Sequence, residues 1–476
     1  MSTSNRERSK VMLFELNEVP WRILEQYATS RQASGVRRVL ENGAGFITRS
    51  PDCQLSPWTT WSTVHRGVPD THHGIVDFGQ ELEEVNRRYE PIWSLAARAG
   101  LRVANNGSLH TYPLPNYLSS CEFWIPDVFA MGPECKPANV RPFQEMNLQM
   151  SRASGRNVSR GIPLGLAARF LANSPRLGIT PRTMARVASH LVSELVTPRV
   201  RLRRRTFQAV LAFDVFYKLM VRTQPDYCTF FTNHVASAMH RYWAAAFPSD
   251  YREANKYDEA WRASFRGEID WAMAAFDRML TRLLAFVGRH PEYSLWIASS
   301  MGQAAVESGQ IRRQVLLVDV VRFMSRLGFE PHEWERRPAM EPRIIVKIRS
   351  AKSASFQERI RSIRILGKYS IACVGLDQAV FRLHPGTILD AQEEFCEMDG
   401  RRVEFSDLGF ANVAVEDGAG QSAYHVREGS LIIYPAPGRR VQRERAEIST
   451  LEIAPAILRT LGVESPSYMV DSRIAA

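Results

Sequence analysis

The stretch VMLFELNEVP, residues 11–20, decides the fold class of this 476-residue chain. Residues 11–16 are a short apolar run of the kind that forms one buried strand, and the polar pair Asn17-Glu18 follows it directly. The residues from Trp21 to Tyr27 then have the pattern of a helix start. Open α/β sheets place their sites at the carboxyl ends of strands, so this polar pair marks a first candidate position.

The same succession of strand and helix returns along the chain. Apolar runs at 101–105, 227–232 and 293–298 predict further strands, and 91–99, 268–290 and 450–461 have the pattern of helices. This alternation predicts an α/β fold with a mostly parallel, doubly wound sheet. We expect a core at 11–330 and 420–476, with a helical insertion at 162–223 and a small β-rich or mixed inserted subdomain at 343–402.

The composition narrows the class of function. Hydrophobic residues make up 45% of the chain, enough for a substantial core, which excludes a wholly disordered protein. The formal net charge of +11 favours an anionic partner, such as a phosphorylated small molecule or a lipid-linked substrate. Nucleic acid is not expected as a partner, because the chain has neither zinc-finger spacing nor an RNP-like aromatic motif.

The sequence also bears on cellular location. Its six cysteines form no CxxC pair, residues 1–10 are polar, and no apolar run approaches the roughly 18–20 residues of a membrane span. These features predict a cytoplasmic protein. The arginine-rich run from Arg199 to Arg205 allows two interpretations, a solvated helix start or a contact with phosphate or lipid headgroups. Peripheral membrane contact therefore stays open.

Four segments carry a further signal through their order and spacing. They are FELNE at 14–18, SPWTTW at 56–61 with GVPDTHHGI at 67–75, the helix and strand at 91–103, and His425 with LEIAPAIL at 451–458. In this order they resemble the alkaline phosphatase superfamily, closest to its type I phosphodiesterase/nucleotide pyrophosphatase branch. The resemblance implies an alkaline phosphatase-like α/β fold and a phosphodiesterase- or phosphatase-like hydrolase or phosphoryl transferase.

The same resemblance implies two divalent ions held by Asp and His, with a Ser or Thr nucleophile at a helix N-terminus. Several matching positions differ here. Asn17 stands for the first Asp, Pro57 falls at the nucleophile by spacing, Ala236 replaces the Asp four residues before His240, and Ser300-Met301 replaces an Asp-His pair. A two-zinc site is therefore not expected, because these side chains are poor ligands for divalent ions. One divalent ion, zinc or manganese, and a metal-free site both stay open.

The candidate site residues fall into three groups. The candidate metal ligands are Glu15, His240 and His425, with Glu18, Asn233 and His234 as substitutes. The candidate catalytic residues are Ser56, Thr59, Thr60 and His234. The candidate substrate-binding residues are Asn17, Asn233, Arg241 and Ser300. Each type has an ordinary structural role as well, since Ser and Thr cap helices and a lone His is often part of a core.

Two functions from different classes follow. The first is an enzyme that acts on an anionic phosphate-containing substrate, with a hydroxyl as nucleophile and an imidazole as general acid or base. The second is a catalytically inactive protein of the same fold, which binds an anion or serves as a scaffold in a glycan or lipid pathway. The substituted positions favour the second function, and the polar residues at strand ends favour the first.

Overall fold

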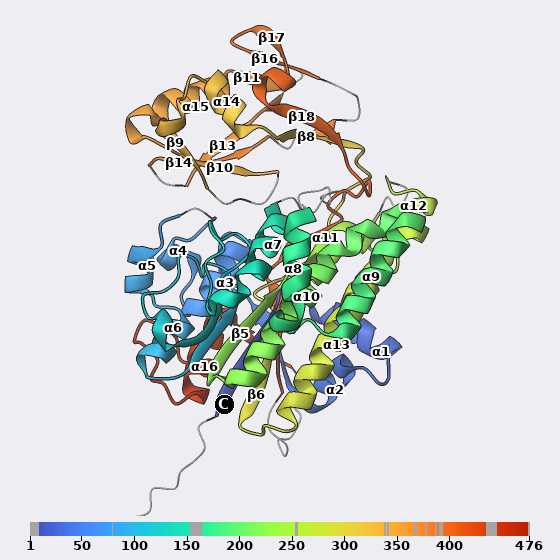
Figure 1. Ribbon diagram of the computed structural model, residues 1–476, viewed down its shortest axis with the longest axis vertical. Coiled ribbons are helices and arrows are strands. Elements are labelled where there is room, and N and C mark those ends of the chain that lie inside the picture. The colour runs from blue at the N-terminus through green and yellow to red at the C-terminus, as the bar shows by residue number, and fades with distance from the viewer. Residues whose placement is uncertain are drawn as a thin grey trace, which may run out of the picture.

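The computed structural model describes residues 9–474, except for 79, 153–163, 253–255, 338, 340–341, 366–368, 377, 386–387, 390–393 and 435–444. Most of the predicted polar N-terminus and residues 162–163 of the predicted helical insertion lie outside the described residues. Figure 1 shows a large unit built around one sheet and a smaller lobe above it.

An eight-stranded sheet forms the centre of the large unit, in the order β21-β2-β20-β6-β1-β5-β3-β4. Its strands are β1 (Lys10–Leu16), β2 (Ala44–Arg49), β3 (Val103–Asn106), β4 (Cys121–Ile125), β5 (Tyr227–Thr232), β6 (Tyr293–Ala298), β20 (Glu428–Tyr434) and β21 (Ala446–Ser449). Among these strands β20 alone runs antiparallel to its neighbours β2 and β6, and the other pairings are parallel. The predicted mostly parallel α/β fold is confirmed.

Strand β1 shows why the sheet is covered on both faces. Met12 and Phe14 enter one hydrophobic core and Val11 and Leu13 enter another, because successive side chains of a strand point to opposite faces. The first core is covered by α1 (Trp21–Ser30), α2 (Gly35–Asn42), α10 (Arg204–Thr223), α11 (His234–Ala246) and α13 (Glu268–Val287). The second is covered by α3 (Pro57–Arg66), α6 (Ile92–Arg98) and α16 (Ile453–Thr460).

Further helices complete the large unit. They are α4 (Asp70–His73), α5 (Glu83–Arg88), α7 (Arg141–Arg152), α8 (Leu164–Leu177), α9 (Pro181–Val196), the 3₁₀ segment η3 (Pro198–Arg203) and α12 (Glu259–Phe265). Helix α9 begins where it does because the Thr180 side chain accepts the Thr183 backbone N–H and Pro181 stands at the first turn. None of the described helices combines the length and the apolar character that crossing a membrane requires.

The smaller lobe has its own hydrophobic core, which includes Phe323, Phe356 and Phe410. Its elements are β8 (Arg313–Leu317), α14 (Val320–Arg326), β9 (Trp334–Arg337), β10 (Ile344–Ile348), α15 (Ser353–Arg361), β11 (Ile363–Ile365), β12 (Tyr369–Ser370), β13 (Ala372–Gly375), β14 (Val380–His384), β15 (Ile388–Leu389), β16 (Phe395–Met398), β17 (Arg401–Glu404) and β18 (Phe410–Ala414). The elements from β10 to β17 correspond to the predicted subdomain at 343–402. The lobe also includes β8, which precedes this range, and β18, which follows it, and these two strands pair with each other.

A two-stranded ribbon joins the lobe to the large unit. It pairs β7 (Gly302–Ala305) with β19 (Ala423–Val426), and His425 lies opposite Gln303. The chain enters the lobe after β7 and returns just before β19. Gly302 is required here, since a Cβ on it would lie 2.1 Å from the Glu428 carbonyl oxygen. The lobe also contacts the large unit through an ion pair between Arg382 and Asp77.

Candidate metal centre and active site

Three side chains from separate elements meet at the carboxyl end of β1. Glu18 follows that strand, His240 lies on α11, and His425 lies on β19. One ligand atom from each, a carboxylate oxygen or an imidazole Nε2, lies within 4.8 Å of the other two. Glu18 Oε2 is 2.9 Å from His240 Nε2 and 3.3 Å from His425 Nε2. We refer to Glu18, His240 and His425 as the Glu–His–His cluster.

Backbone carbonyls fix the orientation of both imidazoles. His240 Nδ1 lies 2.8 Å from the Ala423 carbonyl oxygen, and His425 Nδ1 lies 2.6 Å from that of Leu55. A carbonyl oxygen only accepts, so each Nδ1 carries its proton and donates it. Each Nε2 is thereby left facing Glu18. Metal-binding histidines in proteins are held in this way, with the second ring nitrogen donating to a carbonyl or carboxylate.

The distances in the cluster suit one tetrahedral ion. With zinc–ligand bonds of about 2.0–2.1 Å, neighbouring ligand atoms of a tetrahedron lie about 3.3–3.4 Å apart. The two distances from Glu18 Oε2 to the imidazole Nε2 atoms, 2.9 and 3.3 Å, are close to this ligand–ligand distance. Two imidazoles and one carboxylate are also a donor set that zinc accepts with a fourth position open. The residues present therefore fit a single divalent ion.

Neighbouring amides hold the Glu18 carboxylate in place. Asn17 Nδ2 donates to Glu18 Oε1 and to Asn233 Oδ1, both at 2.7 Å, and Trp61 Nε1 donates to Asn17 Oδ1 at 2.7 Å. Gln303 Nε2 donates to Glu18 Oε2 from the opposite side. Asn17 thus uses its neutral amide to position Glu18. The backbone of Glu18 has φ 61°, an unusual conformation that the surrounding bonds stabilise.

The electrostatics of the cluster follow from burial and charge together. Burial raises the pKa of Glu18, but His425 and His240 outweigh it and hold that pKa well below its usual range. Burial lowers the pKa of His425, but the Glu18 carboxylate raises it above its ordinary value. Without an ion, Glu18 and His425 therefore form an ion pair, and the His425 proton occupies the space between their ligand atoms.

The cluster is open to solvent on one side, and a positively charged side chain of the lobe lies near it. The His240 side chain is 22% exposed, whereas that of Glu18 is 2% exposed, so the site opens on the His240 side. The ring of Tyr424, which is partly exposed, stacks on His425 with centroids 4.3 Å apart. Arg343 from the lobe is close enough to lower the pKa of His425 in part. Arg343 forms no hydrogen bond or ion pair with another described residue, which leaves it available to an anion.

The amino end of α3 lies directly beside the cluster. Its N-cap residue is Ser56, which follows the Leu55 carbonyl that His425 contacts. The Ser56 hydroxyl does not cap the helix and bonds to no other described residue. Thr60 Oγ1 instead bonds to the Ser56 carbonyl at 3.1 Å and to Ser300 Oγ at 2.8 Å. Thr59 Oγ1 is buried without a partner among the described residues. Ser56 is thus the most available of the predicted hydroxyls.

Other predicted site residues lie in separate contacts. His234 Nδ1 bonds to Thr232 Oγ1 at 2.7 Å and its Nε2 to the Ala272 carbonyl at 3.2 Å, and burial lowers its pKa to about 4. Arg241 forms a buried ion pair with Asp417. The structure does not bring either side chain into the Glu–His–His cluster, so their predicted roles in catalysis and substrate binding stay predictions.

Glu15 also lies apart from the cluster, on the opposite face of β1. Its Oε1 lies 2.9 Å from His65 Nε2 and 3.0 Å from Ser108 Oγ, and both Glu15 and His65 are fully buried. Glu18, which the sequence offered only as a substitute ligand, occupies the position predicted for Glu15. The cause is the turn after β1, because the left-handed conformation of Glu18 directs its side chain toward α11 and β19.

Two contributors were absent from the sequence-based candidates. The sequence does not predict a role for Gln303, because a glutamine after a glycine belongs to no distinctive motif. Its place near Glu18 follows from the pairing of Gln303 opposite His425. Trp61 lies within a helix that mixes aromatic and hydroxyl residues, and nothing in that pattern shows that its indole N–H donates to Asn17. The positions of Ala236 and Met301, by contrast, are buried and bring no ligand to the cluster.

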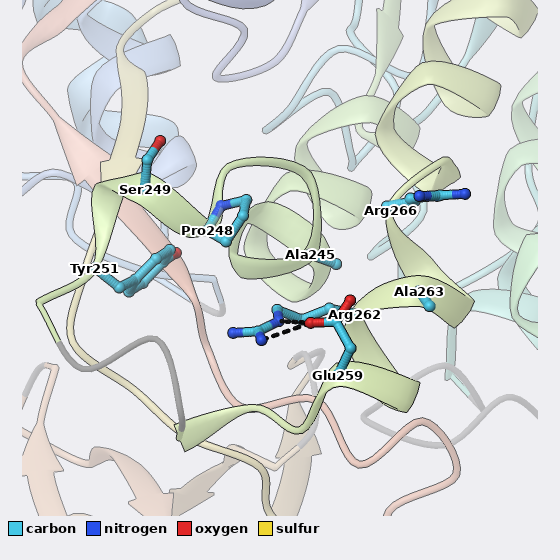
Figure 2. A pocket seen from close by; sticks show the side chains of 8 residues that line it. All are labelled: Ala245, Pro248, Ser249, Tyr251, Glu259, Arg262, Ala263 and Arg266. Atoms are coloured by element: carbon cyan, nitrogen blue, oxygen red, sulfur yellow. Dashed lines mark hydrogen bonds and ion pairs between the residues drawn. The ribbon is translucent and has the colours of Figure 1, made fainter.

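A cavity of about 500 Å³ lies elsewhere, between the end of α11 and α12. Figure 2 shows its lining, in which Arg262 bonds to Glu259 and Arg266 lies nearby. No member of the Glu–His–His cluster lines it. The cavity offers no imidazole or carboxylate pair suited to catalysis, so the cluster is the better candidate for the active site.

Of the comparisons with known proteins, the one with solved structures alone finds similar chains. No protein-family model and no curated protein matches the chain. Similar solved structures include murine ectonucleotide pyrophosphatase/phosphodiesterase 5 in complex with AMP, with 10% identity, 96% of each chain covered and a TM-score of 0.42. Alkaline phosphatase PafA has 12% identity, 98% of each chain covered and a TM-score of 0.47.

A third similar structure is phosphonoacetate hydrolase from Sinorhizobium meliloti 1021 in complex with phosphonoformate, with 13% identity, 96% of each chain covered and a TM-score of 0.41. All three proteins belong to the alkaline phosphatase superfamily, the one that the sequence resembles. At these identities and scores the similarity carries no functional weight, so function has to be inferred from the side chains of this chain.

Proposed function

We propose that this chain hydrolyses or transfers a phosphate ester, with one divalent ion held by the Glu–His–His cluster. The observation that supports this proposal is the orientation of the two imidazoles. Both Nδ1 atoms donate to backbone carbonyls, and both Nε2 atoms face one carboxylate oxygen. An arrangement of this kind prepares three ligand atoms for a cation and leaves a position open on the solvent side.

A divalent ion in this position would neutralise charge on a phosphoryl oxygen and polarise the phosphorus. The chain itself would supply the remaining functions. Ser56 stands at the amino end of a ten-residue helix, where backbone N–H groups and the helix dipole favour a phosphate. Arg343 lies on the lobe side of the cluster and would hold a second anionic oxygen.

The reaction that fits these residues is a displacement at phosphorus. The Ser56 oxygen forms a bond to phosphorus while the bond from phosphorus to the departing ester oxygen breaks, and the hydroxyl proton passes through water to that oxygen, which leaves as an alcohol. Water then cleaves the bond between Ser56 and phosphorus and restores the hydroxyl. The net reaction consumes one water and produces an alcohol and a phosphate with one ester bond fewer.

The test is hydrolysis of p-nitrophenyl phosphate and bis-p-nitrophenyl phosphate by protein loaded with zinc or manganese. We expect Ser56→Ala to lower kcat at least about 100-fold, because a nucleophile has no substitute at that position. Ser62→Ala is the matched control, since Ser62 lies on the same helix but donates its hydroxyl to the Trp58 carbonyl at 2.8 Å. Equal activity of Ser56→Ala and wild type would exclude the Ser56 mechanism.

One observation favours a second candidate function, metal-free anion binding without catalysis. Glu18 bonds directly to both imidazoles, and the positions of Ala236 and Met301 carry no ligand atoms. In that case the His425 imidazolium and Arg343 would bind an anion as fixed positive charges. Thermal unfolding with AMP or inorganic phosphate in the presence of a chelator separates the two functions. A rise in Tm with chelator present, together with no hydrolysis when zinc is added, would support the second.

We also propose a cytoplasmic location. The six cysteines are all free thiols in the structure, even though Cys53 is exposed, which suits a reducing compartment. Fractionation of cells that express the chain, followed by thiol labelling, tests this proposal. Recovery in a secreted fraction with oxidised cysteines would contradict it.

A further inference from the structure

Helix α9 is packed against the large unit on one side only. Thr183, His190 and Glu194 are its buried residues, and they recur at the spacing of a single helix face. His190 Nε2 lies 3.0 Å from Glu194 Oε1, and Arg204 forms an ion pair with Glu194. Through this inner face α9 contacts the large unit, and much of the remaining helix surface faces outward. Figure 1 shows α9 along one flank of the molecule.

The outward surface of α9 carries an apolar strip. Leu191, Val192, Leu195 and Val196 are all exposed, and Leu195 and Val196 reach 83% and 82%. The spacing i, i+1, i+4, i+5 gathers them on one face near the carboxyl end of the helix. Single exposed apolar residues are ordinary, but a contiguous group of four on one helix face marks a surface that contacts something apolar.

A group of arginines lies toward the amino end of α9. Arg182 and Arg186 stand on its first two turns, and Arg278 comes from α13. Arg186 lies three residues after Thr183 and four before His190, so it shares the inner face of the helix, whereas Arg182 is exposed. Burial lowers the pKa of Arg186 and of Arg278, and the like charge of the neighbouring arginines lowers each further. Within the described part of the chain none of the three forms an ion pair with a carboxylate. Uncompensated positive charge is therefore concentrated here, at a cost that a bound anion would remove.

The positive charge continues past the carboxyl end of the apolar strip. Arg199 in η3 is exposed and has no ion pair among the described residues. Arg182 thus precedes the strip and Arg199 follows it, and at about 1.5 Å per residue the two lie roughly 25 Å apart along the chain. The net charge of the whole chain, +11, adds a long-range attraction toward anionic surfaces.

We propose that the outward surface of α9 docks the protein on an anionic lipid bilayer. An amphipathic helix that lies in the plane of a membrane inserts an apolar face between headgroups while cations on its polar face contact lipid phosphates. Leu191, Val192, Leu195 and Val196 form such a face, and the exposed Arg182 and Arg199 supply the cations on either side of it. Docking of this type is peripheral, and it concerns a surface separate from the Glu–His–His cluster.

Sedimentation with lipid vesicles tests this proposal on the full chain. Vesicles of phosphatidylcholine with a quarter phosphatidylglycerol should bind the protein, and pure phosphatidylcholine vesicles should bind it much more weakly. Arg182→Gln with Arg199→Gln should weaken the partition coefficient roughly 25-fold, since each arginine near an anionic surface contributes about fivefold. Binding should also weaken steeply with salt.

The decisive variant leaves the charge unchanged. Leu195→Gln with Val196→Gln should weaken binding by roughly tenfold or more, because the polar side chains gain nothing from the acyl region. Val318→Gln with Val321→Gln is the matched control, since both valines are exposed on the lobe, at 59% and 64%. The exposed position of Leu195 and Val196 means that thermal unfolding should be unchanged by their substitution.

Three results would overturn the proposal. The first is no binding to the anionic vesicles. The second is equal binding by the Leu195→Gln/Val196→Gln variant and by wild type, which would reduce the effect to net charge. The third is light scattering that shows an oligomer in wild type and a monomer in this variant, with no vesicle binding by either. The last result would assign the surface to contact between copies of the chain.

Discussion

Replacement of Glu18 by Gln is the most informative change to the Glu–His–His cluster. Gln keeps the shape of the side chain and removes the charge that faces His240 Nε2 at 2.9 Å and His425 Nε2 at 3.3 Å. Loss of an outer hydrogen-bond partner typically costs about 10–100-fold in metal affinity, so loss of a direct ligand should cost at least about 100-fold. We therefore expect the zinc Kd to rise by that factor or more.

Proton release gives a second, independent readout. With each Nδ1 donating to a carbonyl, an Nε2 that bonds to Glu18 must carry a proton, and an ion has to displace it. Zinc binding to wild type should release up to two protons per ion, and its affinity should fall as pH falls. Isothermal titration calorimetry in two buffers of different ionisation enthalpy measures both quantities, and elemental analysis should find one ion per chain.

Glu15→Gln is the matched control for this experiment. Glu15 is also buried at the end of β1 and lies 2.9 Å from an imidazole, that of His65, but it is not part of the cluster. Its substitution should leave the zinc Kd nearly unchanged. The reasoning is refuted if Glu15→Gln weakens zinc binding as much as Glu18→Gln does, or if wild type binds no ion at all.

Three further outcomes are expected. Gln303→Glu places a second carboxylate against Glu18. Zinc should therefore bind more tightly, while the Tm of the metal-free protein should fall because two carboxylates repel each other. An unchanged zinc Kd together with an unchanged Tm would place residue 303 outside the cluster. Burial lowers the pKa of His73 to about 3 and of His234 to about 4, so the unfolded chain, with imidazole pKa values of about 6.5, binds more protons. The free energy of unfolding should therefore fall by up to about 2.7 kcal/mol per pH unit from these two residues as pH drops from 6.5 toward 4. Urea titrations of His234→Gln should show a total slope that is smaller by about 1.4 kcal/mol per pH unit than that of wild type, whereas an unaltered slope would contradict the assignment. Gly302→Ala would place its Cβ 2.1 Å from a carbonyl oxygen of β20, which should cost about 3 kcal/mol or more and displace the ribbon; wild-type stability would show that the ribbon yields easily.

The fold could be predicted from the sequence because local patterns and long-range pairing agree. The apolar run at 11–16 becomes the centre of the sheet, and the runs at 227–232 and 293–298 become β5 and β6 on either side of it. The lobe was less predictable. Its strands are short and its sheets antiparallel, and β8 and β18 pair across almost a hundred residues of intervening chain, for which no local pattern exists.

The candidate site could be predicted in part for a similar reason. His240 and His425 were selected because a resemblance aligned them with metal ligands, and the structure brings both to one point. The carboxylate partner depended on a single backbone conformation, since the φ of 61° at Glu18 decides which side chain turns toward the imidazoles. His234 stood beside the same strand end, but its position in the first turn of α11 directs it between helices, toward the Ala272 carbonyl.

The ribbon of β7 and β19 gives the smaller lobe a direct influence on ion binding. Both crossings of the chain into the lobe pass through this ribbon, and the ribbon carries Gln303 and His425 opposite each other. Glu18, in contrast, is anchored to the central sheet. A rotation of the lobe that moved the ribbon with it would change the separation of His425 from Glu18, and an ion that bridges them would resist that rotation. Ion affinity and lobe position would then be coupled reciprocally, so a ligand that favours the ion-binding position of the lobe would tighten ion binding by the same factor.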